Sequence, residues 1–495
     1  MTPCLFCIKF SQISQSPVNW RELCRISWKG SVACLGCAWE RCVSKLIGKG
    51  VTIWSLHEPA RNSVLNMKIA VFGLWHLGCV YAASLATLGN NVIAIDEDID
   101  RITTLRAGKL PIAEPGLPEM MKSVVDRHQI KFTSDLHEAS ECELVWITID
   151  TPVNERDIAD VNSVLRSIEN LARHVSDGSS VVISSQLPIG TSALVSEIFS
   201  RVNPAATINL AYSPENLRLG SALKSFMEPD RVVVGSDSPK AIEDVTIALA
   251  TLGKPILGMS TASAEVTKHA LNTFLALSVA FANEIARVSE STGANAFDVA
   301  KALKTDQRIG AQAYVAPGGP IAGGTLARDV RYLEEISKAN SVSVPLINSI
   351  MQSHDEQHQW PIKKIQGQLG STNSKILIVG VAYKAGTSTL RRSFGLEVAT
   401  KLEALGYGIA IYDGLAEALT PETQHMERYK SLLEALQNVD AAVICGPEVS
   451  AKEIPTLLST IKSKIVIIDA IGLLGNDVAI VFSDKYFTPG KGTSK

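Results

Sequence analysis

The segment Lys68-Ile-Ala-Val-Phe-Gly-Leu-Trp-His-Leu-Gly78 decides the fold of this chain of 495 residues. It is an apolar run that ends in a glycine-rich turn, and a helical stretch of small and apolar residues follows it. A second apolar run, Asn91-Val-Ile-Ala-Ile95, then closes on Asp96. Strand, glycine turn, helix, strand and acid in this order predict a Rossmann unit, the fold that binds dinucleotides.

The glycine turn departs from the G-x-G-x-x-G pattern at its second glycine. Gly73 and Gly78 hold the outer positions, and Trp75 stands where a glycine normally lets the backbone approach the pyrophosphate. The indole could occupy the space of the phosphates, pack against the neighbouring helix, stack on a ligand, or lie in the core with no ligand role. We interpret His76 as a loop histidine with a hydrogen-bond partner rather than as a catalytic base.

Length and composition predict an ordinary globular protein. At roughly 150 residues per domain, the chain is long enough for about three domains. Hydrophobic residues make up 46% and charged residues 20%, and the 50 acids nearly balance the 47 bases. This balance argues against nucleic acid as a partner, and no apolar run reaches the ~20 residues that a membrane-spanning helix needs. We therefore expect a cytoplasmic protein with no nucleic-acid or membrane partner.

The first 66 residues differ from the rest of the chain. They hold six of the nine cysteines and show no sustained strand or helix period. Two C-x-x-C pairs, Cys4/Cys7 and Cys34/Cys37, could in principle bind a structural zinc, but their separation is longer than the usual spacing. We interpret residues 1–66 as a poorly ordered extension, or as a stretch upstream of the true start, and expect no metal site. A metal-binding or interaction module is the alternative.

Beyond Asp96 the pattern predicts an α/β domain, a helical segment and a second α/β domain. Strands with helices between most of them continue the first domain, residues 67–261, as a parallel sheet with helices on both faces. The predicted strands cover residues 130–133, 143–149, 180–184, 207–212 and 231–235. The spacing of apolar residues predicts helices over residues 262–355, interrupted by a glycine-rich loop at 317–324. A polar linker is predicted at 366–374, and a second α/β domain is assigned to residues 370–490, which include the end of this linker. Its predicted strands begin at Lys375 and lie near 409–412, 441–445 and 464–469.

Several motifs in this arrangement resemble landmarks of the UDP-glucose/GDP-mannose dehydrogenase family. They occur in the family's order and spacing from Met67 to about Asp469. These motifs are Glu114-Pro-Gly-Leu117, Ser213-Pro-Glu-Asn-Leu-Arg218, Pro229-Asp-Arg231, Asp306-Gln-Arg-Ile-Gly310 and Ala382-Tyr-Lys384. The resemblance implies an α/β fold of two Rossmann-like doubly wound domains joined by a central helical segment. It assigns NAD to the first domain, dimerisation to the central helices and a nucleotide sugar to the last domain, in a homodimer or higher homo-oligomer.

The resemblance also assigns catalytic roles. Lys268 and Asn272 match the family's catalytic lysine and its partner, and a spacing of four residues places both on one helix face. An ammonium group there would stabilise a developing alkoxide. Asp329 matches an aspartate that helps a water act as base, and Glu215 matches an acid/base glutamate.

Further positions match ligand contacts of the family. Asp96 and Arg101 match residues that bind the adenosine ribose, and the aspartate disfavours a 2′-phosphate. The other cofactor positions are Gly73, Trp75, Gly78, Thr151, Pro152 and Arg391. The substrate positions are Arg308, Gly318 and Gly319 in the loop 316–322, Tyr383 and Lys384. The basic residues suit a diphosphate, although they could instead form structural ion pairs.

The chain departs from the family at positions that carry chemistry. Thr325 stands where the family has its nucleophilic cysteine, and a threonine hydroxyl is essentially never ionised without a dedicated base. Gln186 replaces an active-site threonine, Leu219 replaces a glutamate near Glu215, and Ile471 replaces a substrate-binding arginine.

Two functions remain open from the sequence. The first is NAD-dependent oxidation of the alcohol of a UDP- or GDP-sugar, without the cysteine-dependent four-electron route. The alternative is a non-catalytic relative that binds a nucleotide sugar or dinucleotide in a regulatory or scaffolding role.

Overall fold

The computed structural model describes the chain from Leu46 onward, with gaps. The described residues are 46–48, 51–54, 66–152, 159–215, 217–322, 324–382, 390, 393–414, 420–421, 423–446, 453–461, 465–474 and 485–491. Residues Met1–Val43 form a unit of their own, and all described residues belong to the unit Ser44–Lys495. The four cysteines of the two C-x-x-C pairs lie outside the described residues, as do Tyr383, Lys384 and Arg391.

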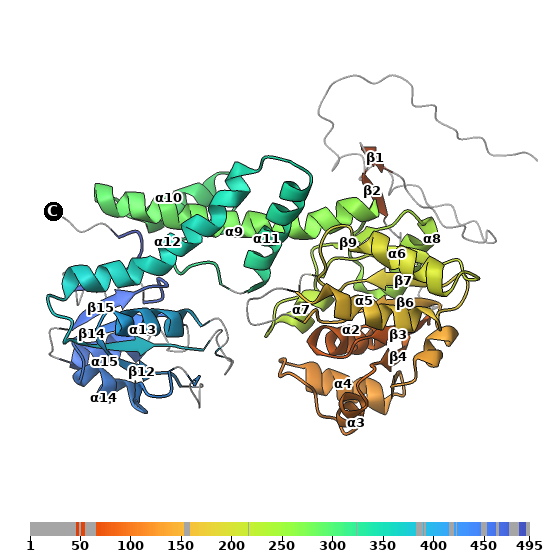
Figure 1. The fold of residues 1–495 in the computed structure, drawn as a ribbon, viewed down its shortest axis with the longest axis horizontal. Coiled ribbons are helices and arrows are strands. Elements are labelled where there is room, and N and C mark those ends of the chain that lie inside the picture. The colour runs from red at the N-terminus through yellow and green to blue at the C-terminus, as the bar shows by residue number, and fades with distance from the viewer. Residues whose placement is uncertain are drawn as a thin grey trace, which may run out of the picture. The chain divides into compact units, whose positions relative to one another are not determined.

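The first α/β domain is built on six parallel strands (Figure 1). Their order is β5-β4-β3-β6-β7-β8, the arrangement of a Rossmann fold. The strands are β3 (Lys68–Phe72), β4 (Asn91–Ile95), β5 (Ile130–Thr133), β6 (Leu144–Ile147), β7 (Ser180–Ile183) and β8 (Asn209–Tyr212). The connecting helices are α2 (His76–Thr87), α3 (Ile99–Arg106), α4 (Leu117–Asp126), η1 (Leu136–Glu141), α5 (Val161–Ala172), α6 (Thr191–Val202), α7 (Ala222–Met227), α8 (Pro239–Ala248) and η2 (Ala250–Leu252). β6 and β7 are buried throughout because helices cover both faces.

The sheet continues beyond β8 in a way that the sequence did not predict. β9 (Val232–Gly235) pairs with β8 in the antiparallel direction, and β10 (Ile256–Met259) runs parallel to β9. The prediction of a wholly parallel sheet was therefore wrong at this edge. A hairpin of β1 (Leu46–Gly48) and β2 (Val51–Trp54) adds to β10, so strands also occur in the segment that we expected to be poorly ordered. Strands of three or four residues are too short to show a period.

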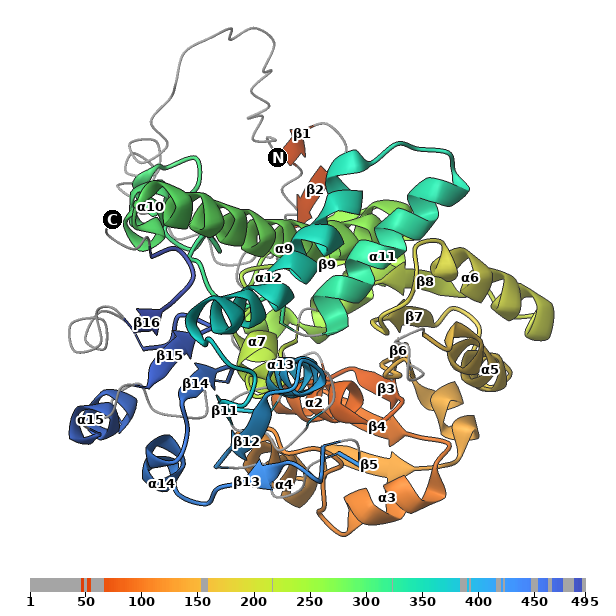
Figure 2. The ribbon, with the colours of Figure 1, turned by 60° about the vertical axis from the view of Figure 1, so that its left-hand side comes forward.

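Four helices form the described part of the central segment. They are α9 (Thr261–Thr292), α10 (Ala296–Thr305), α11 (Gly324–Ala339) and α12 (Pro345–Gln368). α11 packs along α9, as both views show (Figures 1 and 2). The Ser260 hydroxyl accepts from the Ser263 N–H at the start of α9, and Gly293 ends the helix at φ 76°. α12 runs into the predicted linker as far as Gln368. Within the described part of the chain, no helix is long and apolar enough to cross a membrane.

The second α/β domain repeats the topology of the first. Among its described residues, six strands run parallel in the order β13-β12-β11-β14-β15-β16. The strands are β11 (Lys375–Val379), β12 (Gly408–Tyr412), β13 (Glu427–Arg428), β14 (Ala441–Ile444), β15 (Val466–Asp469) and β16 (Tyr486–Phe487), and the described helices are α13 (Phe394–Ala404), α14 (Leu432–Gln437) and α15 (Glu453–Thr460). The predicted class, two Rossmann-like domains joined by a helical segment, is confirmed.

The same turn follows the first strand of each domain. Gly73 after β3 has φ +93° and Gly380 after β11 has φ +84°, a conformation that favours glycine. In the first domain, Asp96 accepts a hydrogen bond of 2.6 Å from the Leu74 N–H. In the second, Asp413 accepts from the backbone N–H groups of two residues after Gly380, at 2.7 and 2.8 Å. An acid at the end of the second strand thus holds each turn.

Candidate active site and dinucleotide site

Helix α9 places Lys268 against the loop that follows β8. The Lys268 side chain is 3% exposed, and its Nζ donates to the backbone oxygen of Glu215. The same ammonium lies 3.3 Å from Glu215 Oε1. Glu215 Oε2 in turn accepts from the Leu217 N–H at 2.8 Å, which orients the carboxylate. Two of the predicted catalytic residues therefore meet as a charged pair with little solvent around the ammonium.

Asp329 on α11 is the centre of a buried hydrogen-bond network. The residue is 0% exposed and accepts from His269 Nδ1 at 2.9 Å, from Gln186 Nε2 at 2.8 Å and from Asn272 Nδ2. Burial raises the pKa of Asp329, but the hydrogen bond from His269 and the charge of Lys268 outweigh it, so the pKa lies below its usual value. Asp329 is therefore a carboxylate at neutral pH.

The network includes two residues that sequence reasoning missed. His269 has its Nδ1 on Asp329, while its Nε2 is buried without a partner among the described residues. The side chain of Arg328 donates to Gln186 Oε1, which fixes the amide whose nitrogen faces Asp329. His269 precedes Asn272 by three residues, so helical spacing could have placed it on the same face.

Thr325 lies one turn before Asp329, at the start of α11, and its side chain is exposed. The three cysteines that the structure describes lie on other elements: Cys79 in α2, Cys142 after η1 and Cys445 after β14. All three are buried, and burial raises the pKa of Cys79 and of Cys142 to about 12. Among the described residues, none of the cysteines therefore lies on α11 with Thr325.

The glycine-rich loop before α11 is hydrogen-bonded to two of the central helices. Asn283 on α9 accepts from the Gly318 N–H at 3.0 Å and donates to the Gly319 oxygen at 2.9 Å. Gln357 on α12 donates to the Gly318 oxygen at 2.8 Å. A Cβ on either glycine would lie 3.0 Å from an atom of Ile471, which follows β15. Ile471 thus packs directly on the predicted substrate loop.

Arg308 has a local partner. Its guanidinium forms two bonds to the Asp306 carboxylate, at 3.0 and 2.7 Å, and its side chain is 89% exposed. The arrangement matches the alternative of an ion pair, and the predicted substrate contact of Arg308 stays a prediction.

The glycine turn after β3 has the geometry of a dinucleotide site. A Cβ on Gly73 would lie 2.7 Å from Ile149 Cγ1, and a Cβ on Gly78 would lie 1.7 Å from the Gly73 oxygen. Asp96 is 4% exposed and accepts from one Arg101 nitrogen at 2.9 and 2.8 Å. The outer glycines allow close packing at the turn, and the two predicted ribose contacts lie together beside it.

Trp75 is at the surface. Its side chain is 41% exposed, so the interpretation as a core tryptophan is wrong. The Arg101 guanidinium carbon lies 5.2 Å from the centre of the indole ring, a cation–π contact. Trp75 thus packs against a residue of α3 and presents its free face beside the turn.

Neighbouring positions complete this edge of the sheet. The Thr151 hydroxyl donates to the Gln186 oxygen at 2.7 Å, and the Pro152 oxygen accepts from the Asp160 N–H at 2.8 Å. His76 Nε2 lies 2.9 Å from Glu114 Oε2, so the histidine has the expected partner, but it is the first residue of α2 and not part of a loop. Thr151 therefore links the dinucleotide turn to the residue that contacts Asp329.

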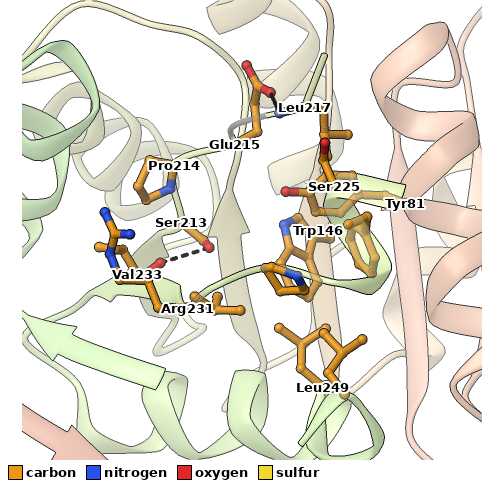
Figure 3. A pocket seen from close by; sticks show the side chains of 14 residues that line it. Tyr81, Trp146, Ser213, Pro214, Glu215, Leu217, Ser225, Arg231, Val233 and Leu249 are labelled. Carbon is orange, nitrogen blue, oxygen red and sulfur yellow. Dashed lines mark hydrogen bonds between the residues drawn. The ribbon is translucent and has the colours of Figure 1, made fainter. Parts of the chain in front are cut away.

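A pocket lies beside the loop that carries Glu215 (Figure 3). It contains an aromatic cluster in which Tyr81 is edge-on to Trp146 at 5.3 Å and to Phe226 at 4.8 Å. The Ser213 hydroxyl donates to the backbone of β9 at 3.0 Å. Figure 3 shows the Glu215 carboxylate pointing away from the rings, so the aromatic cluster packs on the side of the loop opposite to this carboxylate.

Comparisons with known proteins agree over most of the chain. Models of the UDP-glucose/GDP-mannose dehydrogenase family match in order: the NAD binding domain over residues 67–251, the central domain over 262–356 and the UDP binding domain over 377–476. A UDP-glucose 6-dehydrogenase of Rhizobium meliloti is 30% identical over 81% of this chain and 94% of its own length. One from Pseudomonas aeruginosa is 31% identical over 71% of this chain and 80% of its own.

A solved structure supports the fold. The UDP-glucose dehydrogenase of Pyrobaculum islandicum superposes with a TM-score of 0.76, covering 88% of this chain and all of its own, at 24% identity. With the domain order, the glycine turn and the Lys268 and Asp329 clusters, the comparisons give one result. The chain belongs to the UDP-glucose/GDP-mannose dehydrogenase family and is an NAD-dependent oxidoreductase with the three domains of that family.

Proposed function

We propose that the protein oxidises the alcohol of a nucleotide sugar to a carbonyl in one NAD-dependent hydride transfer and releases that product. The observation that carries the proposal is the pair of charged clusters around Lys268 and Asp329, combined with threonine at position 325. In the balanced reaction, the carbinol carbon loses a hydride to NAD, and its hydroxyl loses a proton to the protein or to water.

The residues at the dinucleotide turn fit NAD. The tight turn at Gly73, the close approach at Gly78 and the Asp96 carboxylate support a dinucleotide with a free ribose 2′-hydroxyl. When bound, NAD supplies the hydride acceptor. The exposed face of Trp75, backed by Arg101, offers a surface on which an aromatic ring can stack.

Each catalytic side chain has a role that its surroundings support. The Lys268 ammonium, nearly free of solvent, would stabilise negative charge on the substrate oxygen. The Asp329 carboxylate, held by three donors, would orient a water or accept a proton. Glu215 would exchange a proton at the mouth of the same site. His269 keeps Asp329 ionised and in place.

The ratio of products tests the proposal. Purified protein is incubated with NAD and a panel of UDP- and GDP-sugars, and NADH absorbance is compared with sugar consumed. We expect one NADH per sugar and an aldehyde or ketone product, because Thr325 cannot form the covalent thiohemiacetal that a second oxidation uses. Thr325→Ser should leave the ratio at one, whereas Thr325→Cys should raise it above one.

Two NADH per sugar from the unaltered protein would contradict the single-oxidation proposal. Thermal stabilisation by a nucleotide sugar without any NADH formation would instead favour the non-catalytic alternative. The sugar that gives turnover would also identify the substrate, which the described residues do not specify.

We further propose that a second copy of the chain covers one face of α9. Four large apolar side chains on this helix are exposed at spacings of seven or eight residues, which forms a stripe. They are Val266 (44%), Phe274 (65%), Phe281 (45%) and Val288 (57%). A continuous stripe along a helix of 32 residues fits a helix-to-helix contact between identical subunits.

Phe274→Asp should convert the dimer to a monomer, because a carboxylate in an apolar interface is strongly disfavoured. Sedimentation velocity would measure this. Leu194→Asp on α6 is the matched control, since Leu194 is also exposed (45%) but lies off the stripe. A monomeric unaltered protein, or a dimer that survives Phe274→Asp, would contradict the proposal.

A further inference from the structure

The N-terminus of α2 already holds a carboxylate. The first N–H groups of a helix have no partner within the helix, and in a Rossmann unit they bind the pyrophosphate. Here the Leu77 N–H, in the first turn of α2, donates to Asp150 Oδ2 at 3.2 Å. The Leu74 N–H just before the helix is held by Asp96 at 2.6 Å. An acidic side chain thus lies where the phosphates of a dinucleotide would bind.

The backbone on both sides of Asp150 is held against the turn. Ile149 packs so closely on Gly73 that a Cβ there would lie 2.8 Å from the Ile149 Cα. The Thr151 hydroxyl donates to the Gln186 oxygen at 2.7 Å. The Asp150 side chain between these anchors is open to solvent on one side. The neighbouring residues therefore hold the backbone of Asp150 beside the N-terminus of α2.

We propose that the Asp150 carboxylate competes with the pyrophosphate of the dinucleotide for the N-terminus of α2 and so limits the affinity for NAD. The inference rests on the NAD binding that the proposed function requires. Two negative groups cannot share the same N–H without repulsion.

Charged groups from three elements face Asp150. His76 on α2 and Arg101 on α3 favour its ionised form, and Glu215 after β8 disfavours it. Burial against the surrounding protein has the largest effect and raises the pKa of Asp150 to about 6, although the Leu77 N–H, His76 and Arg101 act in the opposite direction. Above that pH the side chain is ionised and competes; below it the side chain is protonated and the competition ends.

The binding of NAD should therefore weaken as the pH rises through 6. The protonated form of Asp150 is favoured beside the pyrophosphate, so binding above pH 6 takes up a proton at this site. The difference between the unaltered protein and an Asp150 variant isolates the contribution of Asp150.

Calorimetric titration with NAD between pH 5 and 8 tests the inference. We expect Asp150→Asn to bind NAD about tenfold more tightly than the unaltered protein at pH 7.5, with the ratio falling towards one at pH 5. Titrations in two buffers of different ionisation enthalpy should show that the unaltered protein takes up more protons than the variant. Asp126→Asn is the matched control because it removes one negative charge from the exposed end of α4.

Equal NAD affinities at pH 7.5, or a ratio that does not change with pH, would overturn the inference and leave the proposed function intact. Absence of NAD binding by both proteins at every pH would overturn the proposed cofactor as well. Asp150→Ser provides a second uncharged side chain, and thermal unfolding of each variant shows whether it is folded. A folded variant that binds NAD more weakly than the unaltered protein would assign Asp150 to cofactor binding and contradict the competition.

Discussion

Replacing Lys268 with alanine is expected to lower kcat on the order of 10³-fold, because the variant loses the cation that stabilises charge on the substrate oxygen. The ammonium is 3% exposed, so water does not readily replace it. KM should change much less, since the effect concerns charge that develops during the reaction. Initial rates of NADH formation over a range of nucleotide-sugar concentrations separate the two constants.

Lys301→Ala is the control for this variant. Lys301 lies on α10 and is exposed, so its removal changes the net charge equally without touching the site. Thermal unfolding would show that Lys268→Ala is folded. A folded Lys268→Ala protein that retains more than a tenth of the activity would contradict the role given to Lys268.

Replacing Asp329 with alanine is expected to abolish turnover and to lower the free energy of unfolding by about 3–5 kcal/mol. The side chain is completely buried, and its loss leaves the polar groups of His269, Asn272 and Gln186 without their acceptor. Urea unfolding at pH 7 measures the change. The contribution is present above the usual carboxyl pKa and is lost only as the pH falls through the lowered pKa of Asp329.

Asp306→Ala removes a carboxylate whose described hydrogen bonds are all to Arg308, and the Arg308 side chain is exposed. We expect it to leave the unfolding curve unchanged, because exposed ion pairs contribute little to stability. If Asp329→Ala unfolded at the same urea concentration as Asp306→Ala, the network around Asp329 would not be a source of stability.

The strands of the two sheets were predictable where apolar runs were long and buried on both faces. β5 has the predicted bounds, and β7 and β12 differ from them by one residue. β10, β13 and β16 were missed, because runs of two to four residues show no period that distinguishes a strand from a loop. The antiparallel direction of β9 also could not be predicted from the sequence, because a single bridge between Tyr212 and Gly235 defines its pairing with β8.

The candidate site was predictable in part. The spacing of Lys268 and Asn272 places both on one helix face, and each does contact a predicted acid, Glu215 or Asp329. His269 was missed because its importance comes from a partner 60 residues away. Sequence spacing likewise left several positions open for Trp75, and only its exposure and its contact with Arg101 place the ring at the surface.

The acid that ends the second strand of each Rossmann-like domain changes how such residues are interpreted in sequences. Asp96 and Asp413 both hold the backbone of a glycine turn before any nucleotide enters. A search that counted such an aspartate as a ribose ligand would find two dinucleotide sites in this chain. The first role of this aspartate is to hold the glycine turn by hydrogen bonds to its backbone. A nucleotide that binds the same carboxylate uses a residue that the fold already requires.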